Sequence, residues 1–234
     1  MSTAVIVSDQ YTGDVSPDPD RPEDSPVRAQ RRRLAGVDVV KMSVGPMDNN
    51  VYVITDRNSG ASLLIDAAND ADEIMTLLRE LGTTPDQIVT THGHYDHWQA
   101  LAEISNTTSA VTAIGAADAP DVPVPAQRLL NDGDTVVVGS LTLDVIGIVG
   151  HTKGSVALAF TDGDGRVHLF TGDSLFPGGV GKTWQPGDFE ILLDEVSTKL
   201  FDRYDDAVVY PGHGKDTTLG TERPNLPEWR ERGW

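Results

Sequence analysis

The sequence predicts a mixed α/β fold, in which β-sheets form a sandwich that is flanked by helices. Short β-rich runs separated by turn residues recur in both halves of the 234-residue chain. Amphipathic helical segments interrupt these runs. The resulting order is several strands, helix, strand, helix, several strands, helix and strand, which fits layered sheets covered by helices. The length is sufficient for a substantial core in one large domain or two small ones.

The first 35 residues differ from the rest in composition. Residues 14–33, DVSPDPDRPEDSPVRAQRRR, are rich in proline and charge and poor in apolar residues. We therefore expect a partly flexible N-terminal segment over residues 1–35, followed by one folded domain over 36–234 with a short C-terminal tail. The arginines at 31–33 could form a binding patch, but a solvated linker is the better interpretation.

The first half of the folded domain reads as strands followed by alternating helices and strands. The β-rich runs are 36–45, 49–56, 61–68, 86–92 and 110–116. The segment NDADEIMTLLRELG predicts a helix that is capped by Asn69 or Asp70 and ended by Gly82. A second helix is expected to start near Asp96 and to continue through WQALAEIS.

The second half reads as two hairpins, a helix and a final strand. Residues 134–150 predict a hairpin with Gly139 at its turn, and residues 154–172 predict another that turns at the GDG of 163–165. DFEILLDEVSTKLFDR is an amphipathic helix, and AVVYPGHG is a last strand that ends in glycines. The tail from residue 218, with two prolines and two tryptophans, is expected to pack across the fold near the functional site.

The composition is that of an ordinary soluble protein with an acidic surface. There are 36 acidic against 18 basic residues, giving a formal net charge of −18, which argues against nucleic acid as a partner because phosphate binding needs a basic surface. No stretch approaches the roughly 18 apolar residues of a membrane span. The N-terminus also lacks the basic start and apolar run of a signal peptide. We therefore expect a cytoplasmic protein that binds neither nucleic acid nor membrane.

The stretch THGHYDHW, residues 91–98, is the strongest functional signal in the chain. It holds three of the six histidines and one aspartate. His92 and His94 are two residues apart on an extended segment, so they project to the same side and can converge on one ion. Asp96 and His97 lie in the first turn of the next helix and point into the same space at a different angle. Two adjacent metal ions accommodate this set better than one.

Three further residues extend this set, and each stands next to glycine. His151 lies in GHTKGS and His213 in YPGHG, where glycine lets the backbone bend and the ring approach an ion closely. Asp173 follows a strand in LFTGDSLF and is suited to bridge two metals. The remaining histidine, His168, reads as a packed or exposed strand residue. Because the chain has no cysteine, a transition metal must be held by nitrogen and oxygen.

These motifs together resemble the metallo-β-lactamase superfamily over about residues 36–215. THGHYDH is similar to its first metal motif, GHTKGS to the second histidine motif, TGDSLF to the bridging aspartate and PGHG to the last histidine. LLIDAA is similar to the early strand of the family, whose aspartate, here Asp66, is expected to support the site from behind the ligands. The resemblance implies a four-layer αββα sandwich of two mixed sheets with a dinuclear metal centre at one edge.

The resemblance also implies a role for each candidate ligand. One metal would be bound by His92, His94 and His151, a second by Asp96, His97 and His213, and Asp173 would bridge the two. Such a pair of ions, roughly 3.5–4 Å apart, holds a hydroxide between them and lowers the pKa of water from near 16 toward about 7. Asp96 and Asp173 are the carboxylates that we expect to take part in catalysis. Two zinc ions are expected, although iron and manganese accept the same ligands.

Among subfamilies, the chain most resembles glyoxalase II-type enzymes, which hydrolyse thioesters of glutathione. The shared features are THGHYDH, GHTKGS, FTGDSLFPGG and PGHGKDTTLG. The chain departs from that group in having only 21 residues after His213 and a valine where the group has a glycine-flanked cysteine. Lys182 is the basic candidate for a substrate carboxylate. These features suggest a short member that acts on a smaller or different small-molecule acyl-thiol.

Two other functions stay open at this point. A persulfide dioxygenase would use one iron held by His92, His151 and Asp173 in place of two zincs, and metal content separates it from a hydrolase. A regulatory metal-binding module without chemistry is the other. A lactamase is disfavoured by the lack of a signal peptide, and an RNA-processing nuclease by the charge. The sequence leaves the oligomeric state open.

Overall fold

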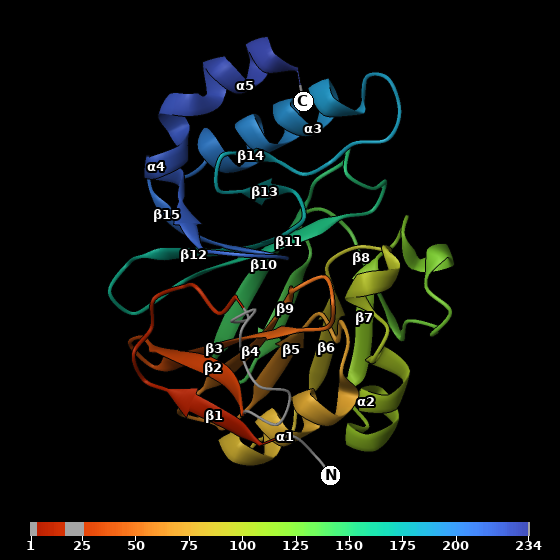
Figure 1. Cartoon of the computed structure of the whole chain (residues 1–234), viewed down its shortest axis with the longest axis vertical. Coiled ribbons are helices and arrows are strands. Elements are labelled where there is room, and N and C mark those ends of the chain that lie inside the picture. Colours follow the sequence, from red (N-terminus) through yellow and green to blue (C-terminus); the bar gives the residue numbers. More distant parts are fainter. Residues whose placement is uncertain (1–3, 17–25, 234) are drawn as a thin grey trace.

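The structure is a computed structural model that describes residues 4–16 and 26–233. Two twisted sheets pack face to face, and helices cover the outer face of each (Figure 1). This arrangement confirms the predicted αββα sandwich of two mixed sheets.

The first sheet has eight strands that follow one another in chain order. They are β1 (Val5–Ser8), β2 (Val27–Arg33), β3 (Val37–Val44), β4 (Asn49–Asp56), β5 (Ser62–Ile65), β6 (Gln87–Thr90), β7 (Val111–Gly115) and β8 (Arg128–Leu130). Strands β2 to β5 pair antiparallel with one another, whereas β1 pairs parallel with β2 and strands β5 to β8 pair parallel with one another. Parallel strands place their carboxyl ends at one edge of the sheet, so the loops after β5, β6 and β7 lie close together.

The second sheet has six strands in the order β16-β15-β12-β11-β10-β9. They are β9 (Thr135–Val138), β10 (Leu141–Gly147), β11 (Val156–Thr161), β12 (Val167–Gly172), β15 (Ala207–Pro211) and β16 (Thr217–Thr218). A small separate hairpin pairs β13 (Leu175–Phe176) with β14 (Gly179–Val180). Strands β12 and β15 are parallel, so the residues that follow them, Asp173 and His213, emerge at the same edge.

Three apolar layers hold the sandwich together. Helices α1 (Ala71–Leu81) and α2 (Leu101–Thr108) pack on the outer face of the first sheet. Helices α3 (Asp188–Val196), α4 (Leu219–Glu222) and α5 (Leu226–Arg232) lie over the second sheet. Between the sheets, aromatic rings meet edge to face: the centroids of Tyr52 and Phe170 are 5.1 Å apart. Burial of these faces supplies the main driving force for the fold.

Several local predictions are confirmed by the structure. Helix α1 has Asp70 at its N-cap and ends at Gly82, whose φ of 64° is the left-handed conformation that favours glycine. Both hairpins form, with Gly139 between β9 and β10. His168 is fully buried in β12, where its ring contacts the Tyr210 hydroxyl and the Asp162 carboxylate. It is therefore a packed strand residue, as expected.

The helix expected to start near Asp96 is interrupted. Tyr95–His97 form a single 3₁₀ turn, and helix α2 begins only at Leu101. The amides of Gln99 and Ala100 donate to the carbonyls of Ala68 and Ala67 rather than to the preceding turn. The loop after β5 thus takes the hydrogen bonds that a continuous helix would need.

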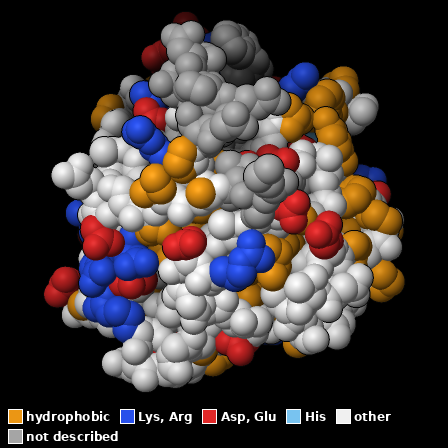
Figure 2. Space-filling view, turned by 60° about the horizontal axis from the view of Figure 1, so that its bottom comes forward, with side chains coloured by type: hydrophobic (Ala, Val, Ile, Leu, Met, Phe, Trp, Pro, Cys, Tyr) orange, Lys and Arg blue, Asp and Glu red, His pale blue; other side chains and the backbone are white. Residues whose placement is uncertain are grey.

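The expected loosely packed segment is wrong for residues 27–33, which form strand β2. This strand pairs antiparallel with β3, and β1 pairs parallel with β2. Arg31 and Arg33 both approach the Asp9 carboxylate, at 3.6 and 3.2 Å. Figure 2 shows basic and acidic side chains side by side on one face of the molecule. Residues 17–25 of the segment lie outside the described part, and the boundary at residue 36 stays a prediction.

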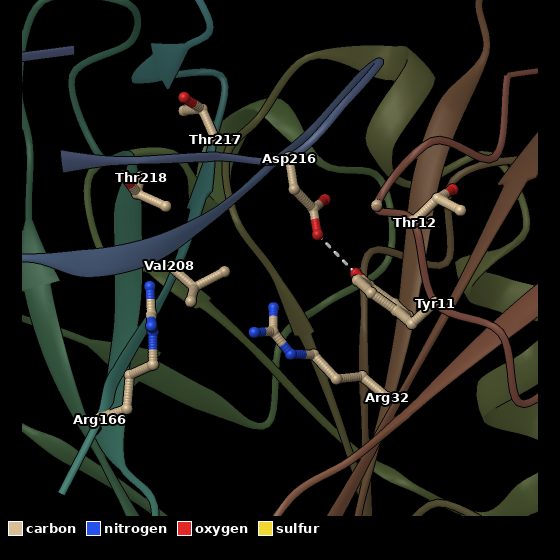
Figure 3. A pocket seen from close by; sticks show the side chains of 9 residues that line it. Tyr11, Thr12, Arg32, Arg166, Val208, Asp216, Thr217 and Thr218 are labelled. Carbon is tan, nitrogen blue, oxygen red and sulfur yellow. Dashed lines mark hydrogen bonds between the residues drawn. The ribbon is translucent and has the colours of Figure 1, made fainter. Parts of the chain in front are cut away.

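A buried polar cluster fastens this N-terminal region to the second sheet. The Tyr11 hydroxyl donates to Asp216 Oδ2 at 2.6 Å, at the seam between the two sheets (Figure 3). Lys41, which is fully buried, donates to Asp216 Oδ1 and to the carbonyl oxygen of Gly13. The carbonyl oxygen of Gly214 is the third acceptor, so all three N–H groups of the ammonium are matched, as burial of a charge requires.

Candidate metal centre

Loops at one edge of both sheets bring the seven predicted ligands together. Four follow β6 in the first sheet: His92, His94, Asp96 and His97. The other three come from the second sheet: His151 from the loop between β10 and β11, Asp173 after β12, and His213 after β15. Side chains separated by up to 121 positions in the chain thus share one site.

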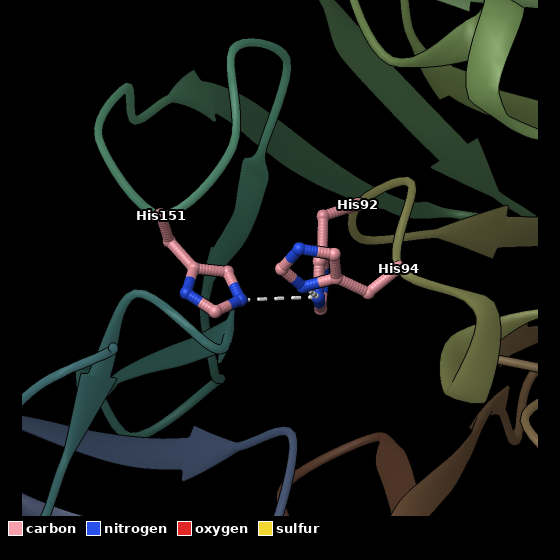
Figure 4. A group of neighbouring side chains, drawn as sticks. All are labelled: His92, His94 and His151. Atoms are coloured by element: carbon pink, nitrogen blue, oxygen red, sulfur yellow. Dashed lines mark hydrogen bonds between the residues drawn. The ribbon is translucent and has the colours of Figure 1, made fainter. Parts of the chain in front are cut away.

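The first cluster consists of three imidazoles. His92 Nε2 lies 3.1 Å from His94 Nδ1 and 3.3 Å from His151 Nε2 (Figure 4). One nitrogen of each ring lies within 4.8 Å of the others. Ring nitrogens that converge in this way from three sides are suited to one divalent cation.

The second cluster contains a carboxylate and two imidazoles. His213 Nε2 lies 3.3 Å from His97 Nε2 and 3.3 Å from Asp96 Oδ2. Asn49 Nδ2 donates to the same Asp96 oxygen at 2.9 Å. This amide fixes the orientation of the carboxylate toward the rings.

Asp173 lies between the two clusters. Its Oδ2 is 3.6 Å from His151 Nε2, in the first cluster, and 3.5 Å from His213 Nε2, in the second. Its Oδ1 is 3.5 Å from His97 Nε2 and is buried without a hydrogen-bond partner among the described residues. A buried, unmatched carboxylate oxygen is costly in a folded protein. Its position therefore fits a cation between the clusters.

Outer hydrogen bonds fix the orientation of the rings. The Nδ1–H groups of three histidines donate to an oxygen acceptor: His97 to Asp66 Oδ2 at 2.9 Å, His151 to the carbonyl of Lys182 at 2.6 Å, and His213 to the carbonyl of Met47 at 2.8 Å. In the neutral ring this leaves Nε2 without a proton, so its lone pair faces the clusters and is available to a metal ion.

Asp66 occupies the supporting position that the sequence suggested. Besides His97, it accepts hydrogen bonds from the amide and the hydroxyl of Thr91 at 2.7 and 2.9 Å. The Thr91 hydroxyl oxygen lies 3.0 Å from His92 Nδ1 and can accept a hydrogen bond from the Nδ1–H group of that ring. Asp66 has a φ of 58°, an uncommon conformation for a residue other than glycine. One strained aspartate therefore orients two histidines of the site.

Asp118 is a functional residue that the sequence analysis missed. Its buried carboxylate accepts hydrogen bonds from the Gly93 amide at 2.9 Å, from the Thr152 hydroxyl at 2.6 Å and from the Gly154 amide at 2.6 Å. It thus joins the loop of His92 and His94 to the loop of His151. Its place just after β7, at the edge where β6 also ends, was the available signal.

Two glycines allow the backbone to approach the site closely. A Cβ on Gly212 would lie 2.1 Å from Asp173 Oδ1 and 2.8 Å from the His97 ring. A Cβ on Gly181 would lie 1.8 Å from the Asp173 carbonyl oxygen and 3.1 Å from His151 Nδ1. No side chain fits at either position without displacing a predicted ligand.

The electrostatics of the site favour cation binding. Burial raises the pKa of Asp173, but the charge of His97 and the close approach of His97 and His213 outweigh it and hold the pKa well below its usual range. Burial and the neighbouring His97 lower the pKa of His92, which keeps that ring neutral. Burial lowers the pKa of His213, but hydrogen bonds to Asp173 and Asp96 outweigh this and raise it to about 10. The ionised Asp173 and the neutral His92 are therefore already in the state that metals bind, whereas His213 would release its proton when a metal binds.

A cavity of about 490 Å³ opens beside the first cluster. His94 and His151 form part of its wall, together with Trp98, Trp184 and Val149. Lys182 is exposed and places its ammonium nitrogen 4.3 Å from the centroid of the Trp184 ring. The cavity gives a small molecule direct access to the candidate metal centre.

The C-terminal tail packs on the fold as expected. Trp229 is buried in the apolar layer beneath α3, with its ring centroid 6.3 Å from that of Phe201. Glu222 and Arg232 both hydrogen-bond the backbone of Gly178, in the loop that follows Asp173.

Within residues 4–16 and 26–233, no helix is long and apolar enough to span a membrane.

An αββα sandwich that gathers five imidazoles and two carboxylates at one edge defines a protein built to bind divalent metals. The chain belongs to the metallo-beta-lactamase superfamily, whose sequence profile matches residues 44–213. The resemblance seen in the motifs is therefore confirmed, and membership of this superfamily supports an enzymatic role.

Individual relatives give a consistent picture. The chain is 28% identical over 205 residues to the hydroxyacylglutathione hydrolase GloC of Haemophilus influenzae, covering 79% of this chain and 94% of that protein. The crystal structure of ETHE1 from Myxococcus xanthus superposes with a TM-score of 0.70 at 28% identity, covering 82% and 84% of the two chains. TTHA1623, crystallised in a di-iron-bound form, superposes with a TM-score of 0.68 at 29% identity, covering 78% and 96%.

Proposed function

We propose that this protein is a metal-dependent hydrolase of acyl-thiol substrates, of the glyoxalase II type. The observation that carries the proposal is the joining of two three-residue clusters by Asp173. Support comes from the similarity to a hydroxyacylglutathione hydrolase over most of both chains. In this proposal, His92, His94 and His151 hold one ion, Asp96, His97 and His213 hold the other, and Asp173 bridges them. Zinc is the proposed metal, and the cytoplasm the proposed location.

The chain's own residues have distinct parts in this reaction. When bound, a pair of divalent ions supplies a water of lowered pKa and an electrophile for the substrate carbonyl. The Asp66 carboxylate and the backbone carbonyls of Lys182 and Met47 accept hydrogen bonds from the Nδ1–H groups of three histidine rings. The rings are therefore already oriented before the substrate binds.

The two carboxylates are placed to hold cations. Asp173 Oδ1 has no hydrogen-bond partner among the described residues, so it would be available to bind an ion. Asp96 is oriented from its other side by Asn49. In the proposal the Lys182 ammonium group lies at the cavity mouth, beside Trp184, where it can meet a substrate carboxylate.

Metal analysis combined with a thioester assay tests the proposal. We expect about two zinc ions per chain in freshly purified protein and hydrolysis of acyl-thiol conjugates that a chelator abolishes and zinc restores. Asp173→Asn should lose both activity and the second metal equivalent. Absence of turnover by metal-replete protein across a broad panel of acyl-thiols would refute the proposal.

A persulfide dioxygenase with one iron is the second candidate. The observation that favours it is the mutual approach of His92, His151 and Asp173: His151 Nε2 is 3.3 Å from His92 Nε2 and 3.6 Å from Asp173 Oδ2. One iron per chain, with oxygen uptake on a persulfide substrate, would support this candidate. Two zincs per chain would exclude it.

A further inference from the structure

Exposed apolar side chains gather at the mouth of the candidate metal centre. Among the described residues, nine large apolar side chains are exposed, and four of them lie here: Met47, Tyr95, Val149 and Trp184, hereafter the apolar rim. Tyr95, Val149 and Trp184 line the cavity. Met47 joins them because its sulfur receives a hydrogen bond from the Tyr95 hydroxyl at 3.2 Å. An apolar cluster that stays exposed around a cavity marks a binding surface.

Trp184 is held in place although it is 58% exposed. Its ring meets that of His94 edge to face, with centroids 6.1 Å apart and an interplanar angle of 82°. The Lys182 ammonium group lies over the indole, 4.3 Å from its centroid. Across the cavity, Trp98 is anchored by a hydrogen bond from its indole nitrogen to the Gly93 carbonyl at 3.0 Å. The cavity thus has two oriented indoles beside a predicted metal ligand.

The charges around the cavity do not favour a strongly anionic ligand. Its described lining contains Lys153 but no arginine, and it also contains Asp121 and Asp188. If Lys182 is added, the two lysines are balanced by these two aspartates. Asp118 also lines the cavity and adds a third carboxylate, which three uncharged donors hold in place. A carrier such as glutathione, with two carboxylates, would need two unopposed cationic partners.

We propose that the apolar rim selects acyl-thiol substrates with an apolar acyl group on a thiol carrier of low charge, and that Trp184 is the residue that sets this preference. This inference rests on the proposed hydrolase function and adds the substrate class. Hydrolysis breaks the C–S bond, forms a C–O bond with water and delivers one water proton to the departing thiolate. The apolar group lies against Trp184 while this exchange takes place at the carbonyl carbon.

A series of matched thioesters measures the preference. Acetyl, butyryl and hexanoyl thioesters of N-acetylcysteamine, a small uncharged thiol, are compared with hexanoyl-glutathione on the zinc-loaded full chain. We expect kcat/KM to rise about two- to fourfold per added methylene, the range for partial to complete burial of that group. The glutathione thioester should be at least about tenfold slower than its neutral counterpart, because it places two carboxylates where cations are balanced.

Variants assign the effect to the rim. Trp184→Ala should abolish the dependence on chain length, whereas Trp184→Phe should keep most of it because the aromatic surface remains. Val137→Ala is the matched control: Val137 is 52% exposed on β9 and is not among the cavity residues. Unchanged chain-length dependence in Trp184→Ala would overturn the assignment to Trp184.

A binding measurement separates failure of this inference from failure of the proposed function. Non-hydrolysable thioether analogues of the hexanoyl compounds are titrated against tryptophan fluorescence. If the neutral thioether binds more tightly but no thioester is hydrolysed, the hydrolase proposal fails and the binding preference stands. If the glutathione thioether binds as tightly or more tightly, or if neither binds, the inference is overturned.

Discussion

The Asp118 carboxylate offers the sharpest test of how the two ligand loops are held. Replacement by asparagine keeps the size of the side chain but turns one acceptor oxygen into an amide donor. The Thr152 hydroxyl can turn toward Ser155, with which it already makes a hydrogen bond. The amides of Gly93 and Gly154 cannot turn, because each belongs to a fixed backbone. Whichever way the new amide lies, one of these two N–H groups faces a donor.

The magnitude follows from that single mismatch. A buried donor left without an acceptor costs about 1–3 kcal/mol. Asp118 contacts no predicted ligand directly but ties together the loops that carry His92, His94 and His151, so we expect its loss to lower metal affinity by about the 10–100-fold seen when the outer support of a metal ligand is removed. We therefore expect Asp118→Asn to weaken zinc binding by one to two orders of magnitude. We expect the free energy of unfolding to fall by about 2 kcal/mol. Asp118→Ala, which leaves all three donors unmatched, should be worse on both measures.

Competition with a chromophoric chelator measures the affinity, and urea unfolding with and without metal measures the stability. Asp121→Asn is the matched control, since Asp121 is an exposed carboxylate of the same turn and should leave both quantities near those of the unmodified protein. Circular dichroism establishes that each variant is folded before affinity is compared. Wild-type zinc affinity in folded Asp118→Asn would refute the role assigned to this carboxylate.

Three further predictions concern other parts of the molecule. Asp66→Ala should reduce metal affinity about 10–100-fold, because His97 loses the acceptor of its Nδ1–H; chelator competition would show it, and unchanged affinity would contradict it. The Ser140 amide, with the Ser59 and Ser140 hydroxyls and the Asn58 amide, holds the pKa of Asp56 below its usual range. This stabilisation is present above about pH 4 and is lost as pH falls through the lowered pKa, so the destabilisation by Asp56→Asn in urea should shrink between pH 7 and pH 3. Trp229→Ala should cost about 3–5 kcal/mol and lower Tm by roughly 6–20 °C in a calorimetric scan, and a shift under about 2 °C would exclude a stabilising role for the tail.

The sequence predicted most of the site because its ligands stand in short motifs at the ends of strands. His92, His94, Asp96 and His97 are adjacent in the chain, and His151, Asp173 and His213 each stand beside glycine. The structure brings all seven together, whereas their role as ligands stays a proposal. Asp118 escaped notice because its function depends on contacts with residues 25 and 36 positions away, which no local pattern reveals.

The same reasoning explains the errors in the fold. Strand β2 has four arginines and one glutamine among its seven positions, so its composition resembles a linker. Its pairing with β1 and β3 makes it a strand. The expected helix forms as α2, but its start near Asp96 was wrong because the carbonyl groups of Ala67 and Ala68 accept hydrogen bonds from the amides of Ala100 and Gln99. Long, regular elements such as α1 and the two hairpins were predicted well because their patterns are local.

The seven donors are divided between the two sheets, four on one and three on the other. Each three-residue cluster takes two residues from the first sheet and one from the second. The position of one sheet relative to the other therefore determines how close the predicted ligands lie. A substitution deep in the interface, for example at Tyr52 against Phe170, would tilt one layer on the other and alter both clusters at once. In this chain, side chains far from the cavity would thus influence how closely the two groups of predicted ligands approach each other.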